Sequence, residues 1–287
     1  SVRRLITSLT NGTFKYELDS GEFIKVKISV DHKNKEAIID FSGTSKQSKS
    51  NFNSPESVTK AATLYVFRSL INEVIPMNEG CLKPLKIIIP KASILSPEYP
   101  AAVVAGNVET SQCITDCLYG ALGKLAASQG TMNNLTFGNS DIQYYETICG
   151  GAGAGYNFHG CDAVHTHMTN SRLTDPEILE KNFPVILKSF SILYGSGGSG
   201  EWNGGAGVER QICFTDRVHV SILSNHRRIA PFGIKGGNDG RTGENLLIRE
   251  HGKTIKLKST QTISANPGDT IIIQTPGGGG YGSPKKH

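Results

Sequence analysis

The sequence predicts an α+β fold, with a mixed α/β lobe over residues 1–182 and a glycine-rich antiparallel β lobe over residues 183–287. Apolar residues recur at helical spacing in several segments before residue 182, and beyond it almost every apolar pattern alternates as in a strand. The chain has 33 glycines among 287 residues, which favours many tight turns. A hydrophobic content of 37% and a charged content of 19% are typical of a globular protein with a sizeable core.

The first lobe is predicted to mix helices with strands. The predicted helices cover residues 1–10, 54–72, 109–128 and 175–182. Ser54 and Thr174 are predicted as caps at two helix starts, and Gly130 as the stop of the third helix. The predicted strands cover residues 23–30, 37–41, 85–89, 133–137, 144–149 and 163–169.

The second lobe is predicted to consist of strands joined by glycine turns. Its predicted strands cover residues 186–193, 208–214, 218–223, 245–249, 253–257 and 270–274. The glycine-rich stretches 195–207 and 277–280 are interpreted as loops or linkers between them. Trp202 inside the first stretch favours a packed loop over a linker.

Two histidines dominate the central stretch, residues 144–177. If residues 163–169 form a strand, His165 and His167 share one face, because side chains alternate along a strand. Histidines in that pattern can hold a metal ion or bind a carboxylate or carbonyl of a substrate. A half-exposed strand with a polar side is the alternative, and no third metal ligand is evident from spacing.

Glu146 lies on the neighbouring predicted strand, 144–149. If the two strands pair, Glu146 comes within reach of the histidines, and the three side chains are expected to share a cleft. The glycines between the strands, at 150–155, either form a structural turn or present backbone N–H groups to an anion. The stretch is not a phosphate-binding P-loop, since no Gly-Lys-Ser/Thr follows it.

Polar residues also precede the predicted helix 109–128. Asn107 and Glu109 are expected to face the same cleft, although a carboxylate in a first helical turn is also stabilised by the helix dipole. Asn133 and Asn134 serve either as amide donors or as turn formers.

Bulk properties exclude some classes of protein. The net charge of +5 is mild and scattered, so no nucleic-acid partner is expected, and no apolar run is long enough to cross a membrane. The six cysteines form no CxxC pair and no secretory signal is visible, which predicts free thiols and a cytoplasmic location. Because the chain starts at Ser1 without a start methionine, it is expected to be a piece of something longer.

Several segments, in order along the chain, resemble the hydantoinase B/oxoprolinase family. They are DFSGTS (40–45), IPMNEGCLKPLKIIIP (75–90), PAAVVAGNVETSQ (100–112), GTMNNLTFG (130–138), YYETICGGAGA (144–154), HTHMTNSRLTDPEILE (165–180), SGGSGEWNGGAGVER (196–210) and TPGGGGYGSP (275–284). They span nearly the whole chain. The HxxDxGG metal motif found in the N-terminal half of the family's B component has no counterpart in residues 1–287.

The resemblance implies the C-terminal half of a B component whose enzyme opens cyclic amides such as hydantoin or 5-oxoproline at the expense of ATP. It implies that ATP and Mg²⁺ bind to a partner A component, that a divalent metal binds in the N-terminal half of the B component, and that this chain alone is inactive. The family also includes the large subunits of acetone and acetophenone carboxylases, so a carboxylase subunit is an alternative, and a non-catalytic assembly module is another.

The implied chemistry needs groups that activate water beside a phosphorylated, imidate-like intermediate, and histidine, carboxylate and amide side chains suit that task. The residues predicted to act in catalysis are Glu146, His165 and His167. Those predicted to bind the substrate are Asn107, Glu109, Asn134 and Asn170. No tightly held metal is expected in this chain.

Overall fold

The computed structural model describes residues 1–76 and 78–284, so residue 77 and the end of the predicted second lobe, 285–287, lie outside the described part. The chain forms two compact units, Ser1–Leu125 and Ala126–His287. The predicted α+β class is confirmed, but the predicted boundary at residue 182 is wrong. Strand β5 (Asn134–Gly138) pairs with β9 (Val218–Leu223) and with β6 (Gln143–Thr147), which joins the segment before 182 to the second unit.

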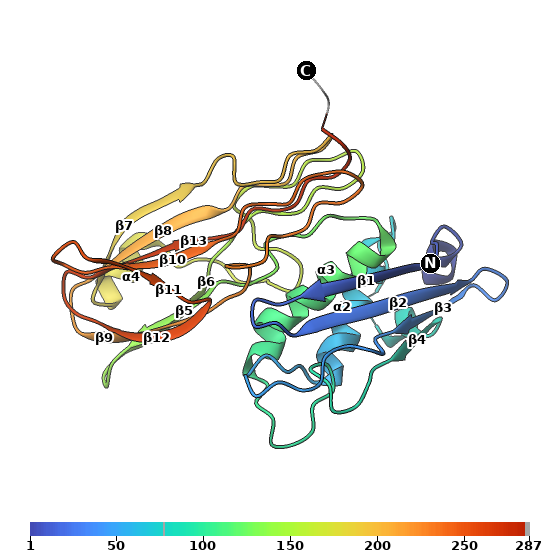
Figure 1. Ribbon diagram of the computed structural model, residues 1–287, viewed down its shortest axis with the longest axis horizontal. Coiled ribbons are helices and arrows are strands. Elements are labelled where there is room, and N and C mark those ends of the chain that lie inside the picture. The colour runs from blue at the N-terminus through green and yellow to red at the C-terminus, as the bar shows by residue number, and fades with distance from the viewer. Residues whose placement is uncertain (77, 285–287) are drawn as a thin grey trace. The chain divides into compact units, whose positions relative to one another are not determined.

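The first unit is a four-stranded sheet with helices on one face (Figure 1). Its strands, in sheet order, are β1 (Gly12–Glu17), β2 (Phe23–Asp31), β3 (Glu36–Asp40) and β4 (Leu85–Ile88). Three of these strands match the predicted ones, and β1 was not predicted. β3 and β4 are parallel, and the other neighbours are antiparallel.

The helices of the first unit differ from the prediction at their ends. They are α1 (Val2–Ile6), α2 (Glu56–Ser69), the short 3-10 helix η1 (Glu79–Leu82), the π-turn η2 (Gly106–Thr110) and α3 (Ser111–Leu122). α3 ends at Gly123, whose left-handed backbone (φ +62°) stops the helix well before the predicted Gly130. The N-cap of α2 is Pro55, without a side-chain cap bond, so the predicted cap role of Ser54 is wrong.

The second unit packs two antiparallel sheets face to face. The first has the order β11-β10-β13-β8-β7 and the second β12-β9-β5-β6. The further strands are β7 (Val185–Ile192), β8 (Val208–Phe214), β10 (Glu244–Ile248), β11 (Thr254–Leu257), β12 (Thr260–Ala265) and β13 (Thr270–Gln274). Inward side chains of both sheets, such as Phe137 and Phe214, build one core.

The described part of the second unit contains a single helix. It is α4 (Pro176–Asn182), whose predicted position is confirmed. Its cap is Asp175, whose carboxylate accepts hydrogen bonds from the backbone N–H groups of Glu177 and Ile178, so the predicted cap Thr174 is wrong. The sequence patterns missed β12, whereas β8, β9 and β13 have the predicted bounds.

The glycine-rich stretches of the second unit form a bundle of extended chains that hydrogen-bond to one another. Residues 150–155, 196–207 and 276–280 run beside each other here; Figure 1 shows such extended segments beyond the ends of β8 and β13. Gly205 N–H donates to the Ala152 carbonyl (2.8 Å), and Gly278 N–H donates to the Gly205 carbonyl (2.9 Å). These stretches are therefore packed structure, and the interpretations as a turn and as linkers are wrong. The prediction that Trp202 is packed is confirmed, because it forms a two-way backbone bridge with Tyr281.

All six cysteines are free, as predicted. Among the helices of the described residues 1–76 and 78–284, none combines the length and apolar character needed to cross a bilayer.

Candidate functional site

The two histidines lie on an irregular loop, residues 165–170, called the histidine loop below. The predicted strand 163–169 is wrong: Val164 makes only an isolated bridge, and Ala163 and His167 have left-handed backbones (φ +50° and +51°). Thr169 N–H donates to the Thr166 carbonyl (3.1 Å) and closes a turn. Because left-handed residues break the alternation of a strand, that alternation no longer places both imidazoles on one face.

Both ends of the histidine loop are fastened to one continuous segment, residues 144–150. At the first end, Gly150 and Val164 exchange two backbone hydrogen bonds (3.2 and 2.9 Å). At the second end, the hydroxyls of Thr147 and Ser171 are hydrogen-bonded (3.0 Å). The loop is therefore held along the end of β6, although no strand pairing is involved.

Glu146, in the middle of that segment, is committed to a buried ion pair. Arg210 Nε lies 2.7 Å from Glu146 Oε1, and Arg210 Nη2 lies 3.0 Å from Oε2. Both side chains are 2% exposed. β6 pairs with β5 and not with residues 163–169, so the pairing that was to bring Glu146 against the histidines does not form.

Arg210 was missed in the sequence, yet a signal for it exists. β8 alternates, and Val208, Arg210, Ile212 and Phe214 are its buried positions. A charged residue at a buried position of a strand needs an ionic or hydrogen-bonding partner. The ring of Phe190 on the neighbouring strand β7 covers Arg210, with its centroid 5.3 Å from the guanidinium carbon.

Tyr144 extends the ion pair towards the second end of the loop. Its hydroxyl donates to Glu146 Oε2 (2.8 Å), since a carboxylate only accepts. The Thr174 hydroxyl, 2.9 Å away, then serves as the donor to the Tyr144 oxygen. Burial and the neighbouring Glu146 charge raise the pKa of Tyr144 to about 12, so it keeps its proton at neutral pH.

His165 has the properties of a neutral imidazole. It is half-buried, and burial lowers its pKa. Its Nδ1 is buried without a hydrogen-bond partner in the part of the chain that the structure describes. A neutral imidazole offers one nitrogen as acceptor, as a general base requires. His167 is also half-buried.

The predicted substrate-binding residues of the second unit differ in exposure. Asn134 is buried: its Nδ2 donates to the Leu223 carbonyl (2.8 Å), and its Oδ1 accepts from the Tyr145 hydroxyl (2.6 Å). Its contacts are those of a side chain that braces β5, β6 and β9. Asn170, at the end of the histidine loop, is exposed and available to a ligand.

Asn107 and Glu109 belong to the first unit, where both lie in the π-turn η2. Asn107 is exposed and Glu109 is fully buried. π-turns inside helical segments frequently mark functional sites. Whether these two residues share a cleft with the histidine loop stays a prediction.

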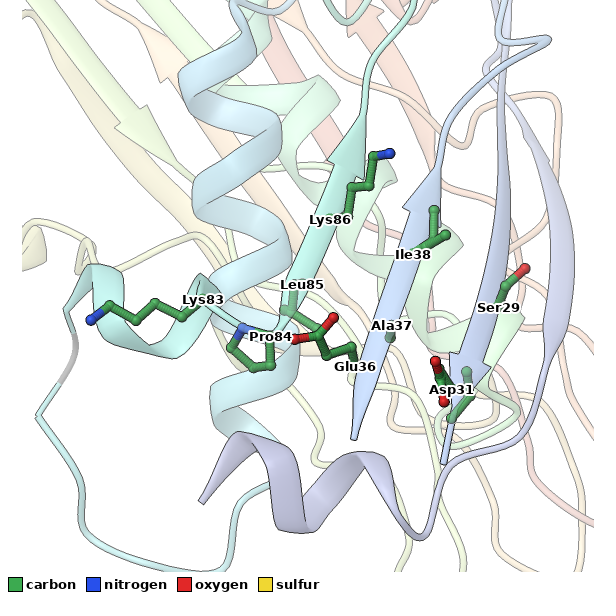
Figure 2. A pocket seen from close by; sticks show the side chains of 10 residues that line it. Ser29, Asp31, Glu36, Ala37, Ile38, Lys83, Pro84, Leu85 and Lys86 are labelled. Carbon is green, nitrogen blue, oxygen red and sulfur yellow. The ribbon is translucent and has the colours of Figure 1, made fainter. Parts of the chain in front are cut away.

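Two hollows in the described part of the surface are lined by other residues than the predicted ones. One hollow, in the first unit, has a volume of about 300 Å³. Figure 2 shows residues that line it, among them Lys86, Ile38 and Ser29 on the neighbouring strands β4, β3 and β2. A hollow of about 370 Å³ in the second unit is lined by residues including Arg217 and His219. Within residues 1–76 and 78–284, no three His, Cys, Asp or Glu side chains gather in a way that could hold a metal ion.

The fold, an α+β first unit and a two-sheet second unit with a glycine bundle, matches two solved structures. The fold matches an ATP-dependent caprolactamase from Pseudomonas jessenii (TM-score 0.82, 22% identity, 98% of this chain and 53% of that one). It also matches an acetone carboxylase (TM-score 0.82, 17% identity, 99% and 47%). At these identities the likeness establishes the fold alone.

The chain belongs to the hydantoinase B/oxoprolinase family, whose model matches residues 1–284. It is 49% identical over 265 residues to a 5-oxoprolinase of Dictyostelium discoideum, covering 92% of this chain and 21% of that protein. It is 47% identical over 310 residues to a 5-oxoprolinase of Saccharomyces cerevisiae (99% and 24%). A putative D-/L-hydantoinase subunit of Pseudomonas sp. is 28% identical over 280 residues (91% and 47%). The chain therefore spans less than a quarter of these 5-oxoprolinases.

Proposed function

We propose that this chain is part of an ATP-dependent hydrolase that opens the ring of 5-oxoproline. The observation that carries the proposal is the difference in similarity among relatives. Identity reaches 49% and 47% with proteins described as 5-oxoprolinases, and it is 28% with the putative hydantoinase subunit. Since the three matches each cover more than nine-tenths of this chain, the difference favours 5-oxoproline over a hydantoin.

The chemistry of such a ring opening fits a neutral histidine. The lactam oxygen attacks the γ-phosphate of ATP, ADP leaves, and the ring carbon becomes an imidate-like electrophile. Water adds to that carbon while a base takes its proton, and the C–N bond then breaks as the ring nitrogen takes up a proton, which opens the ring and leaves an acyl phosphate. A second water hydrolyses the acyl phosphate to the carboxylate and free phosphate. We assign the role of base to His165, because its burial keeps the imidazole neutral at the pH of the cytoplasm, the proposed location.

The remaining residues and the partner components are proposed to bind the intermediate, the nucleotide or a metal, or to stabilise the structure around the site. His167 and the exposed Asn170, on the same loop, are proposed to contact the intermediate. ATP and Mg²⁺ are proposed to bind to an A-type component, and a divalent metal to the N-terminal half of the B component. Glu146 and Asn134 are proposed to stabilise the structure around the site and not to bind the substrate, because their polar atoms already have hydrogen-bond partners.

A non-catalytic assembly module is the second candidate function. Two of the predicted site residues, Glu146 and Asn134, act as internal braces, and such bracing is what a purely structural module would also contain. This candidate predicts that no substitution on the histidine loop changes turnover unless it also changes assembly of the complete enzyme.

The experiment is ADP release by the complete enzyme that contains this chain, with 5-oxoproline, a hydantoin, and acetone plus bicarbonate as substrates. We expect release to depend on 5-oxoproline and to exceed release with the hydantoin or the ketone. Release that depends on acetone and bicarbonate instead would identify a carboxylase.

A further inference from the structure

We infer that Arg210, Glu146 and Tyr144 form a positioning chain that fixes the second end of the histidine loop. The inference rests on the proposed function of that loop. None of the three side chains is proposed to contact the substrate. Arg210 binds Glu146, Glu146 binds Tyr144, and Tyr144 is hydrogen-bonded to the Thr174 hydroxyl.

The first link is the rigid ion pair. Two parallel N–H···O contacts of 2.7 and 3.0 Å fix the guanidinium and carboxylate planes relative to each other. Both side chains are 2% exposed, so water does not compete for either group. Arg210 belongs to β8 and Glu146 to β6, and these strands lie in different sheets. The pair therefore ties the two sheets together at the level of the histidine loop.

Tyr144 transfers that rigidity to the loop. It donates to Glu146 Oε2 (2.8 Å), and its oxygen lies 2.9 Å from Thr174 Oγ1. Packing restrains the Tyr144 ring, because its centroid lies 4.9 Å from that of Phe137 and 4.8 Å from that of Phe183. The position of the Tyr144 hydroxyl is thus fixed, and its hydrogen bond with the Thr174 hydroxyl restrains Thr174.

The two ends of the loop are held in different ways. The first end is held by the backbone bonds between Gly150 and Val164. The second end is held by two side-chain bonds, Thr147–Ser171 and Tyr144–Thr174. The backbone bonds at the first end use no side-chain atom, so only the second end depends on hydroxyl groups. Loss of the Tyr144 or Thr174 hydroxyl removes one of these two bonds and is expected to loosen the second end, which Thr147–Ser171 still holds, while the first end stays in place.

The test compares Tyr144→Phe, Thr174→Val and the double variant with the wild type, all in the complete enzyme. Hydrogen exchange of peptides covering residues 165–174 is expected to rise about fivefold in each single variant, as the loss of one ordinary hydrogen bond implies. The double variant is expected to rise no further than Tyr144→Phe alone, because Tyr144→Phe already removes the bond to Thr174. Thr174→Ser keeps the hydroxyl and should restore wild-type exchange. Tyr194→Phe is the control, because it removes the hydroxyl of a tyrosine that is 82% exposed, and it should leave the exchange of these peptides unchanged.

Turnover gives a second, independent measurement. The variants are expected to lower kcat for 5-oxoproline severalfold and to leave the KM for ATP unchanged. Wild-type exchange at 165–174 in both single variants would overturn the inference. If exchange rises but the wild-type enzyme does not turn over 5-oxoproline, the positioning chain stands and the proposed function fails.

Discussion

Both charges of the Glu146–Arg210 pair are removed from water, since each side chain is 2% exposed. Removing one partner leaves the other charge buried and unpaired, at a cost of about 3–5 kcal/mol. Arg210→Met is therefore expected to lower the free energy of unfolding by about that amount, measured by urea unfolding. Adding Glu146→Leu should recover part of the loss, since no buried charge then remains.

A matched control is available at the surface. Lys256 and Glu244 form an ion pair of 2.8 Å whose side chains are 73% and 31% exposed. Lys256→Met is expected to change the free energy of unfolding by at most about 1 kcal/mol, because water screens the pair. Equal losses for Arg210→Met and Lys256→Met would contradict the role given to the buried pair.

His165 makes the stability of the second unit depend on pH. Burial lowers its pKa in the folded state, so the folded protein binds fewer protons there than the unfolded chain. The stabilising contribution of the neutral imidazole is thus complete above the ordinary histidine pKa and is lost as pH falls. Wild type is expected to lose more stability between about pH 7.5 and 5 than His165→Gln. The measurement is urea unfolding at several pH values, with the exposed His251→Gln as control. Parallel pH curves for wild type and His165→Gln would count against a buried, neutral His165.

At the scale of elements, the glycine bundle has the least tolerance for side chains. A methyl group on Gly151 would lie 2.0 Å from the Gly205 carbonyl oxygen and 2.4 Å from the Gly278 nitrogen, both backbone atoms that cannot rotate away. Gly151→Ala is expected to destabilise the second unit by at least about 2 kcal/mol, measured by thermal or urea unfolding. Gly195 has open space around it and φ +77°, so Gly195→Asn, which tolerates this backbone, should cost less than about 1 kcal/mol. The reverse order would show that the extended stretches are not packed as described.

Sequence patterns predicted those elements whose stability is local. β8, β9 and β13 have the predicted bounds, because β8 and β9 alternate strictly between more and less buried positions and β13 has a buried run of three isoleucines. α3 is shorter than predicted because a left-handed Gly123 ends it, and β12 was missed because its polar residues hide the alternation. The histidine loop was predicted as a strand because positive φ angles at Ala163 and His167 leave no mark in the sequence.

At the scale of the whole molecule, the fold class and the family could be predicted, whereas the division of the chain could not. The boundary follows Leu125 because β5 pairs with β9, a strand far along the chain, and β6 pairs with β5. No local pattern encodes the pairing of β5 with β9. The candidate site was predicted in part: the histidines were identified, while Arg210, Tyr144 and Thr174 were overlooked. Their roles arise from contacts between residues up to 64 positions apart.

The measurement that tests the central claim most directly is 5-oxoproline-dependent ADP release by the complete enzyme, compared between wild type and His165→Gln. If the neutral imidazole of His165 activates water, His165→Gln should lower kcat by about 100-fold or more, the usual contribution of a general base, while the enzyme still assembles and binds ATP. Wild-type turnover in an assembled His165→Gln enzyme would contradict the claim and favour a non-catalytic role for this chain.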